Sequence, residues 1–185
     1  MYLIVGLGNP ENEYAHTRHN MGFDTINEIA KKNNININKT KFKSLYETSI
    51  IQGEKVILLK PQTFMNLSGE SVREIVDFYN IEPEKVIVIY DDIDTEKGKI
   101  RIRKKGGPGS HKGMISVINE LKTEDFPRIR VGIGQPEPKN DMINYVIGKI
   151  PEDEEKILIQ GVKKAAEAVE EILKNGIDIA MNKFN

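Results

Sequence analysis

Residues 3 to 10 read Leu3-Ile4-Val5-Gly6-Leu7-Gly8-Asn9-Pro10, a short apolar run that leads into two closely spaced glycines. An apolar, β-branched run bounded by glycine is typical of a β-strand. Glycine after such a strand allows a tight turn or a close approach of the backbone to a ligand. The stretch therefore predicts a strand that opens an α/β fold and points its carboxyl end toward a loop with functional potential.

Further strands and helices are predicted along the rest of the chain. Other β-branched runs indicate strands over Thr48–Gln52, Val56–Leu59, Val86–Tyr90, Lys99–Arg103 and Ile129–Ile133. Apolar residues at helical spacing indicate helices over Phe23–Lys32, Ser71–Tyr79 and Met114–Leu121, and a long amphipathic helix from Pro151 to a stop at Gly176. Ser71 and Glu74 have the spacing of a capping box.

The order of these elements predicts the fold class. Strands that alternate with helices favour an α/β layer fold, and the turn signal at Gln52-Gly53-Glu54 predicts a hairpin, so the sheet should be mixed rather than wholly parallel. We expect a single domain over residues 1–185, with a twisted mixed sheet flanked by helices and a long C-terminal helix.

Composition excludes several classes of protein. The chain has 185 residues and no cysteine, which removes disulfides, thiolate zinc sites and cysteine nucleophiles. No leader peptide is evident, and no apolar stretch approaches the roughly 20 residues of a membrane span, so a cytoplasmic protein is expected. The net charge of -1 argues against a protein that coats nucleic acid but allows a local basic surface.

The glycine turn after the first strand resembles the start of a dinucleotide-binding fingerprint. Glu11 stands at the third glycine position, and Pro10 disrupts the turn. Both departures disfavour dinucleotide binding, but the alternative of a plain glycine turn leaves Asn9 unexplained.

Candidate acid–base residues follow two of the predicted strands. His19 lies in the segment Tyr14–Asn20, and an imidazole is the side chain best suited to proton transfer near neutral pH. Asp91 stands at the end of a strand, where a carboxylate can hold one ring nitrogen of a histidine and stabilise its charged form. A surface histidine and a solvated turn remain alternatives, as does a magnesium site formed by Asp91, Asp92 and Asp94.

Asn66 lies between apolar residues just before a predicted helix. In that position an asparagine is often a helix N-cap. Its amide can equally donate to a developing oxyanion or orient a water during acyl transfer. The sequence spacing does not decide between the two roles.

A basic segment precedes a glycine-rich loop. Lys99, Arg101 and Arg103 alternate with isoleucines, which places their charges on one face of a strand. The segment fits a phosphate-binding surface, although a solvated edge strand protected by charge is an equal alternative. Gly106–Gly113 follows as a loop whose amides can meet an anion, without the Gly-Lys-Ser/Thr ending of a P-loop.

Taken together, these segments resemble the bacterial peptidyl-tRNA hydrolase family. Residues 3–10, Tyr14–Asn20 with Gly22, Pro61–Gly69 and Arg130–Gly134 match the family's signature blocks in order. The resemblance implies a single α/β domain that hydrolyses the ester between a peptide and the 3′ end of tRNA. It implies no metal, no cofactor and no obligate protein partner, and a monomer whose substrate is peptidyl-tRNA.

The resemblance also implies roles for particular residues. His19 corresponds to the catalytic base and Asp91 to the carboxylate that orients it. Asn9 corresponds to the residue that helps to distinguish blocked from free aminoacyl groups. Asn66 corresponds to the asparagine that holds the substrate end and its water.

Contacts to tRNA are implied in the same way. Tyr14 and Phe64 match positions that contact the tRNA 3′ end, and Arg103 and Arg130 match a basic pair that clamps the 5′ phosphate. Lys112 stands where the family usually has an asparagine. Lysine offers only donors, so we expect Lys112 to contribute to RNA affinity rather than to proton transfer.

Two other classes of function are alternatives to hydrolysis by water. A non-catalytic RNA-binding protein could use the same scaffold, but it would not need the combination of His19, Asp91, Asn9 and Asn66. A dinucleotide-dependent oxidoreductase is disfavoured by the broken glycine fingerprint. Attack by a serine is disfavoured because the chain has no Gly-x-Ser-x-Gly elbow.

Overall fold

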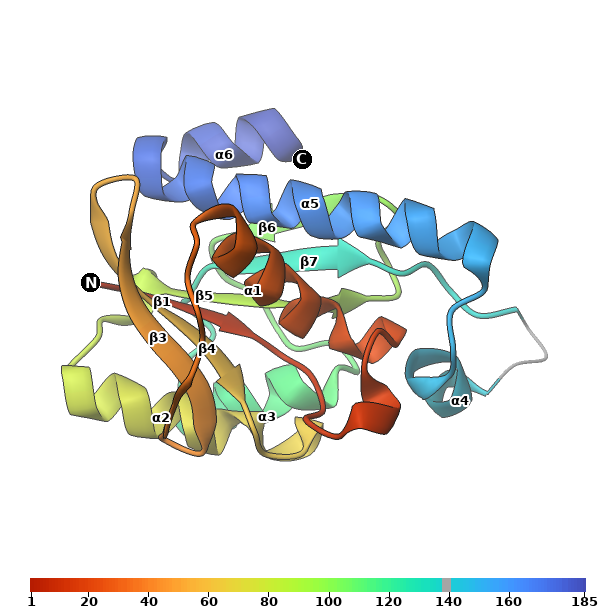
Figure 1. The fold of residues 1–185 in the computed structure, drawn as a ribbon, viewed down its shortest axis with the longest axis horizontal. Coiled ribbons are helices and arrows are strands. Elements are labelled where there is room, and N and C mark those ends of the chain that lie inside the picture. Colours follow the sequence, from red (N-terminus) through yellow and green to blue (C-terminus); the bar gives the residue numbers. More distant parts are fainter. Residues whose placement is uncertain (138–140) are drawn as a thin grey trace.

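The computed structural model describes residues 1–137 and 141–185. Within these residues seven strands form one mixed sheet in the order β2-β3-β4-β1-β5-β7-β6, and Figure 1 shows its twist. Strands β1, β4, β5 and β7 run parallel to one another, while β2, β3 and β6 pair antiparallel. The strands are β1 (Tyr2–Gly6), β2 (Lys39–Lys41), β3 (Ser44–Ile51), β4 (Glu54–Pro61), β5 (Val86–Asp92), β6 (Ile100–Arg103) and β7 (Arg128–Gly132).

Helices cover both faces of the sheet. Figure 1 shows α1, α5 and α6 on one face and α2 and α3 on the other, with α4 beside the ends of the strands. The helices are α1 (Met21–Lys32), α2 (Ser68–Tyr79), α3 (Lys112–Leu121), α4 (Met142–Ile147), α5 (Glu152–Asn175) and α6 (Ile177–Phe184), and the 3-10 turns are η1 (Asn12–Tyr14), η2 (Arg18–Asn20), η3 (Met65–Leu67) and η4 (Pro83–Lys85).

Each face of the sheet has its own apolar core. Ile4 of β1 packs in the core beneath α1 and α5, whereas its neighbours Leu3 and Val5 pack in the core above α2 and α3. This alternation follows from the two-residue period of a strand. A strand that is buried on both faces reads as a continuous apolar run, as residues 3–5 do.

The fold class and most elements agree with the sequence-based expectation. All six predicted strands and all four predicted helices are present, and Ile51 pairs with Glu54 across the expected hairpin turn. The long helix α5 ends at Asn175, and Gly176 follows it as the predicted stop, with a positive φ of 93° that favours glycine. The apolar stripe of its amphipathic pattern is buried, and it consists of Leu158, Val162, Ala165, Val169 and Ile172.

The capping box at Ser71 is a wrong prediction. Helix α2 begins three residues earlier, at Ser68, so Ser71 lies inside the helix. Its buried hydroxyl instead donates to the carbonyl oxygen of Phe42. Ser71 therefore fastens α2 to the loop between β2 and β3.

Three short elements were not predicted. Strand β2 has three exposed residues, so it lacks an apolar pattern. Helices α4 and α6 have six and eight residues, which is too few for a clear helical period. No helix in the part of the chain that the structure describes is both long and apolar enough to cross a membrane.

The connection after β1 does not have dinucleotide-binding geometry. Two 3-10 turns, η1 and η2, separate the glycine turn from α1, which begins only at Met21. A dinucleotide site needs a helix N-terminus directly after the turn. The loop from Leu7 to Asn20 instead brings polar side chains to the carboxyl end of β1.

Helix α1 contacts the sheet through glycine. A Cβ on Gly22 would clash with the backbone of Leu7 and Ile89, and a Cβ on Gly6 would clash with the carbonyl of Gly22. The start of α1 therefore rests directly on the backbone of β1 and on the carbonyl of Ile89 in β5. This approach also fixes the adjacent turn η2 against the end of β5.

We expect Gly22→Ala to destabilise the fold by about 1–3 kcal/mol or more, because the added methyl group meets rigid backbone rather than a movable side chain. Chemical denaturation would measure the change. Gly161→Ala is the matched control, since its Cβ would meet Val131 Cγ1 at an ordinary 3.4 Å within a helix and alanine favours helix by about 1 kcal/mol. Equal unfolding midpoints for the two variants would contradict the close contact.

Candidate active site

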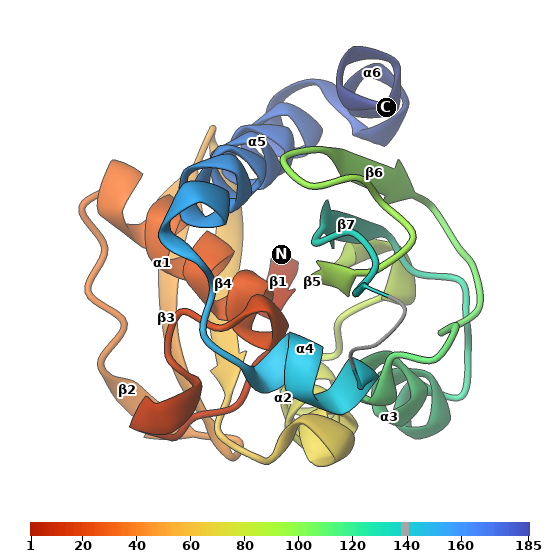
Figure 2. The ribbon, with the colours of Figure 1, turned by 90° about the vertical axis from the view of Figure 1, so that its right-hand side faces the viewer.

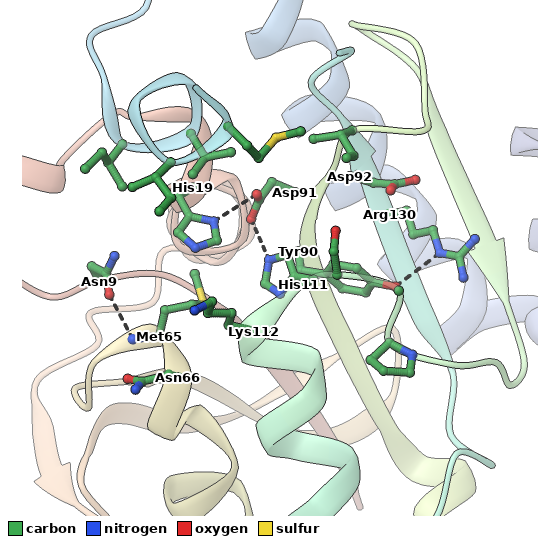
Figure 3. Close-up of a pocket in the computed structure, with 18 of the residues that line it drawn as sticks. Asn9, His19, Met65, Asn66, Tyr90, Asp91, Asp92, His111, Lys112 and Arg130 are labelled. Atoms are coloured by element: carbon green, nitrogen blue, oxygen red, sulfur yellow. Dashed lines mark hydrogen bonds and ion pairs between the residues drawn. The ribbon is translucent and has the colours of Figure 1, made fainter. Parts of the chain in front are cut away.

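A cavity of about 410 Å³ opens at the carboxyl ends of the parallel strands. Its walls come from the loops after β1, β4 and β5, from the start of α3, and from α4. Figure 3 shows Asn9, His19, Asn66, Asp91 and Arg130 arranged around it. Ligands of open α/β sheets bind in this location, because loops from neighbouring parallel strands converge there.

Asp91 is the buried centre of the cavity. Only 4% of the residue is exposed, and it lies near the end of β5. One carboxylate oxygen lies 2.9 Å from His19 Nδ1, and the other lies 2.9 Å from His111 Nε2 (Figure 3). The two imidazoles therefore share one carboxylate, with their ring centroids 5.1 Å apart.

The second hydrogen bond of His111 determines its tautomer. The backbone N–H of Met114 donates to His111 Nδ1 over 3.2 Å, which makes this side chain the N-cap of α3. Because Nδ1 accepts this hydrogen bond, Nε2 must carry the hydrogen that it donates to Asp91. His111 is thus held between the start of α3 and the carboxylate of Asp91.

Burial and the charge of Asp91 act in opposite directions on His19. Burial alone lowers the pKa of His19, but the negative charge and hydrogen bond of Asp91 outweigh it, so the pKa is raised above its ordinary 6.5. Burial likewise works against ionisation of Asp91, yet the two histidines hold the pKa of its carboxyl far below the usual range. Asp91 is therefore a carboxylate at every working pH.

This geometry gives His19 the features of a general base. Its Nδ1–H donates to Asp91, which leaves the lone pair on Nε2. The side chain is 14% exposed, so solvent reaches it from the cavity. The arrangement can accept a proton from water and stabilise the resulting imidazolium.

The same residues form the one candidate metal cluster in the described part of the chain. The ligand atoms of His19, Asp91 and His111 lie within 4.8 Å of one another. However, Met114 N–H already occupies the free lone pair of His111, so a metal ion would have to break the helix cap. The donor set does not fit a metal without this rearrangement.

The alternative magnesium site is also disfavoured. Both oxygens of Asp92 accept bonds within their own turn, one from the Thr95 hydroxyl and the other from the backbone N–H of Asp94. Asp91 is turned toward the two histidines. The three carboxylates therefore do not converge on one point.

Two asparagines complete the polar part of the cavity. Asn9 is 8% exposed, and its side-chain oxygen accepts from Met65 N–H over 2.8 Å. This bond leaves the amide NH₂ of Asn9 as the group available to a ligand. Asn66 is exposed inside η3, before α2, and caps neither helix, so the N-cap interpretation is not supported.

Four arginines share one face of the β6–β7 ladder. Arg101 lies opposite Arg130, and Arg103 lies opposite Arg128. None of the four forms an ion pair with a carboxylate among the described residues. Like charges directly opposite each other are unfavourable, so this face is suited to an anion. Arg130 Nε donates to the Tyr90 hydroxyl at the rim of the cavity (Figure 3).

Arg128 is the buried member of this set. It is 0% exposed, and its guanidinium donates to the carbonyl oxygens of Gly106, Gly107, Glu124 and Phe126. The bond to Gly106 is 2.6 Å long. Arg128 therefore fixes the glycine-rich loop from below.

The structure brings most of the predicted site residues together. Those that line the cavity are Asn9, His19, Phe64, Asn66, Asp91, Lys112 and Arg130. Tyr14 lies in η1 and Arg103 lies on β6, both outside the cavity lining. Lys112 is the exposed first residue of α3.

Sequence reasoning missed His111. The pattern of its segment predicts a glycine-rich loop and an RNA contact by Lys112, but it assigns no role to the histidine. The available signal was a histidine three residues before the predicted helix Met114–Leu121, at the end of a loop that follows a strand. That pattern does not reveal that Asp91 takes two imidazoles rather than one.

Comparison with known proteins agrees with this site. A statistical description of the peptidyl-tRNA hydrolase family matches residues 3–185. The chain is 54% identical over its full 185 residues to peptidyl-tRNA hydrolase of Clostridium beijerinckii, covering 96% of that protein. It is 56% identical, over the full length of both chains, to the enzyme of a Thermoanaerobacter species.

A solved structure gives the same result. The crystal structure of peptidyl-tRNA hydrolase from Acinetobacter baumannii matches with a TM-score of 0.93 and 37% identity, over 99% of this chain and 93% of that one. Sequence and fold thus agree over the whole described chain. The chain belongs to the peptidyl-tRNA hydrolase family, whose members are enzymes that hydrolyse peptidyl-tRNA.

Proposed function

We propose that this chain hydrolyses the ester between a peptide and tRNA, with His19 as the general base. The observation that carries the proposal is the 2.9 Å bond between His19 Nδ1 and the buried carboxylate of Asp91. This bond directs the lone pair of Nε2 toward a cavity of about 410 Å³. The function rests on this dyad together with family membership.

The proposed reaction proceeds through water. His19 Nε2 takes a proton while the water oxygen bonds to the ester carbonyl carbon, and the carbonyl oxygen becomes an oxyanion. Asp91 stabilises the imidazolium. The bond between the carbonyl carbon and the ribose oxygen then breaks, and the imidazolium returns its proton to that oxygen. The products are free tRNA and a peptide carboxylic acid, which releases its remaining proton to solvent and becomes a carboxylate.

The two asparagines are assigned to the substrate. Asn66 supports the oxyanion and positions the water. The free NH₂ of Asn9 donates to a peptide carbonyl next to the ester. A free aminoacyl-tRNA carries an ammonium group near that position, which offers donors only, so this contact favours blocked substrates.

The basic residues are assigned to tRNA. Arg103 and Arg130 hold the 5′ phosphate region, and Lys112 adds affinity for the RNA backbone. Phe64 and Tyr14 contact the 3′ CCA end. We further propose that the enzyme acts as a monomer without a cofactor, because one chain supplies every group that this mechanism uses. A cytoplasmic location is also proposed, since tRNA is its substrate.

His19→Ala should lower kcat by about 10²- to 10⁴-fold, because proton transfer to a positioned base is lost. Binding of tRNA should change little. Release of tRNA from N-acetyl-aminoacyl-tRNA, with the unblocked aminoacyl-tRNA in parallel, measures both activity and discrimination. Full activity of a folded variant would contradict the role of His19.

Loss of parent activity on chelation, with recovery on adding magnesium, would contradict a metal-free mechanism.

The pH dependence of activity should report the titration of His19 beside Asp91. Activity requires neutral His19, so kcat/KM should fall as the pH drops through the raised pKa of this histidine. Asp91→Asn removes the charge that raises this pKa, so the acidic limb should move to lower pH while kcat falls. An acidic limb that stays in place in the Asp91→Asn variant would show that another group controls it.

Replacement of Arg103 and Arg130 by Ala should weaken substrate binding and flatten its dependence on salt. Each lost phosphate contact should reduce the slope of log affinity against log salt by about 0.7–0.9. Lys163→Ala is the control, because it also removes a positive charge, at an exposed position on α5. A parent-like slope in the double variant would mean that these arginines do not touch phosphate.

A further inference from the structure

Arg18, the residue before His19, is buried and donates hydrogen bonds to three acceptor atoms. It is 5% exposed. Its Nε and Nη2 donate to the two carboxylate oxygens of Glu154 over 3.0 and 2.9 Å, and its Nη1 donates to the carbonyl oxygen of Tyr145 over 2.9 Å. The guanidinium carbon also lies 4.0 Å from the centroid of the Tyr145 ring.

These contacts join three elements around the cavity. Arg18 belongs to η2, Tyr145 to α4 and Glu154 to the first turn of α5. Tyr145 extends the chain of contacts, because its hydroxyl donates to the carbonyl oxygen of Ile133, beyond β7, over 2.6 Å. Figure 2, which looks onto the strand ends, shows α4 in front of them between the two layers of helices.

Helix α4 contributes an apolar wall to the cavity. Met142, Ile143, Val146 and Ile147 all line it. Met142 and Ile143 are 39% and 61% exposed, which is high for large apolar side chains. Such exposure inside a functional cavity is typical of a surface that binds an apolar ligand.

The apolar part of the substrate is the peptide. Phosphates and ribose are polar, so the variable apolar groups near the ester are amino-acid side chains. The side chain of the esterified residue is the nearest of these to the carbonyl that water attacks. A wall formed by isoleucine, valine and methionine therefore suits this side chain rather than RNA.

We propose that Arg18 is a positioning residue that fixes α4, and that α4 packs against the side chain of the esterified amino acid. The inference rests on the proposed peptidyl-tRNA hydrolysis. The proposal predicts that, at low substrate concentration, substrates whose esterified residue is large and apolar are hydrolysed faster than substrates that carry glycine there. Arginine is required because lysine cannot bond Glu154 at two points, donate to Tyr145 and stack on its ring at once.

The test compares N-acetyl-phenylalanyl-tRNA with N-acetyl-glycyl-tRNA in the parent and in Arg18→Lys. We expect KM for the phenylalanyl substrate to rise about tenfold, because an apolar pocket contact is worth about 10–200-fold in specificity. KM for the glycyl substrate and kcat for both should stay within about twofold. A rise in KM at constant kcat marks lost substrate binding, not lost chemistry.

Lys97→Met is the matched control. Lys97 also contacts Glu154, at 3.4 Å, but its substitution leaves all three acceptor atoms of Arg18 in place. We expect this variant to keep the parent's preference for phenylalanine. An equal loss of preference in both variants would show that the preference depends on the positive charges around Glu154 and not on the position of α4. That result would overturn the proposal.

Ile143→Ser provides a second variant whose exposed position spares the fold. It should reduce the preference for phenylalanine in the same way as Arg18→Lys. Unchanged preference in Ile143→Ser, or a fall in kcat with unchanged KM in Arg18→Lys, would overturn the proposal. Failure of the parent itself to release tRNA from either substrate would instead contradict the proposed function.

Discussion

The carboxylate of Asp91 is the interaction on which the site depends. A charge in the interior costs several kcal/mol unless it is partnered. Asp91 has two imidazole partners, each 2.9 Å away, and each comes from a different loop. The loop after β1 and the loop before α3 are therefore held at the end of β5 by one buried charge. The close contact of Gly22 with the sheet backbone brings the first of these loops within reach.

The sequence carries strong information on the sheet and weaker information on the rim of the site. Residues 3–5 and 86–90 are continuous apolar runs, because strands buried on both faces have no polar side to interrupt the pattern. Helix α4 has only six residues, and most of its apolar side chains line the cavity, whereas Tyr145 is buried in the core. Local periodicity does not distinguish such a segment from a loop.

Site residues were predictable where one residue type has few structural uses. A histidine and an aspartate after two parallel strands point to a dyad, since strand ends converge. The roles of Asn9 and His111 are harder to predict, because each depends on a second hydrogen-bond partner. Met65 N–H orients the amide of Asn9, and Met114 N–H sets the tautomer of His111. Such backbone partners become visible only in three dimensions.

The carbonyl bonds of Arg128 have a consequence for the outer side of the glycine-rich loop. A planar trans peptide directs its C=O and the following N–H in opposite directions. The carbonyl of Gly106 points at the buried guanidinium, so the amide hydrogen of Gly107 points away from it. The interior positive charge thereby orients a peptide dipole whose positive end faces outward. In this way a side chain that never meets solvent helps to set the electrostatic potential of the surface above it.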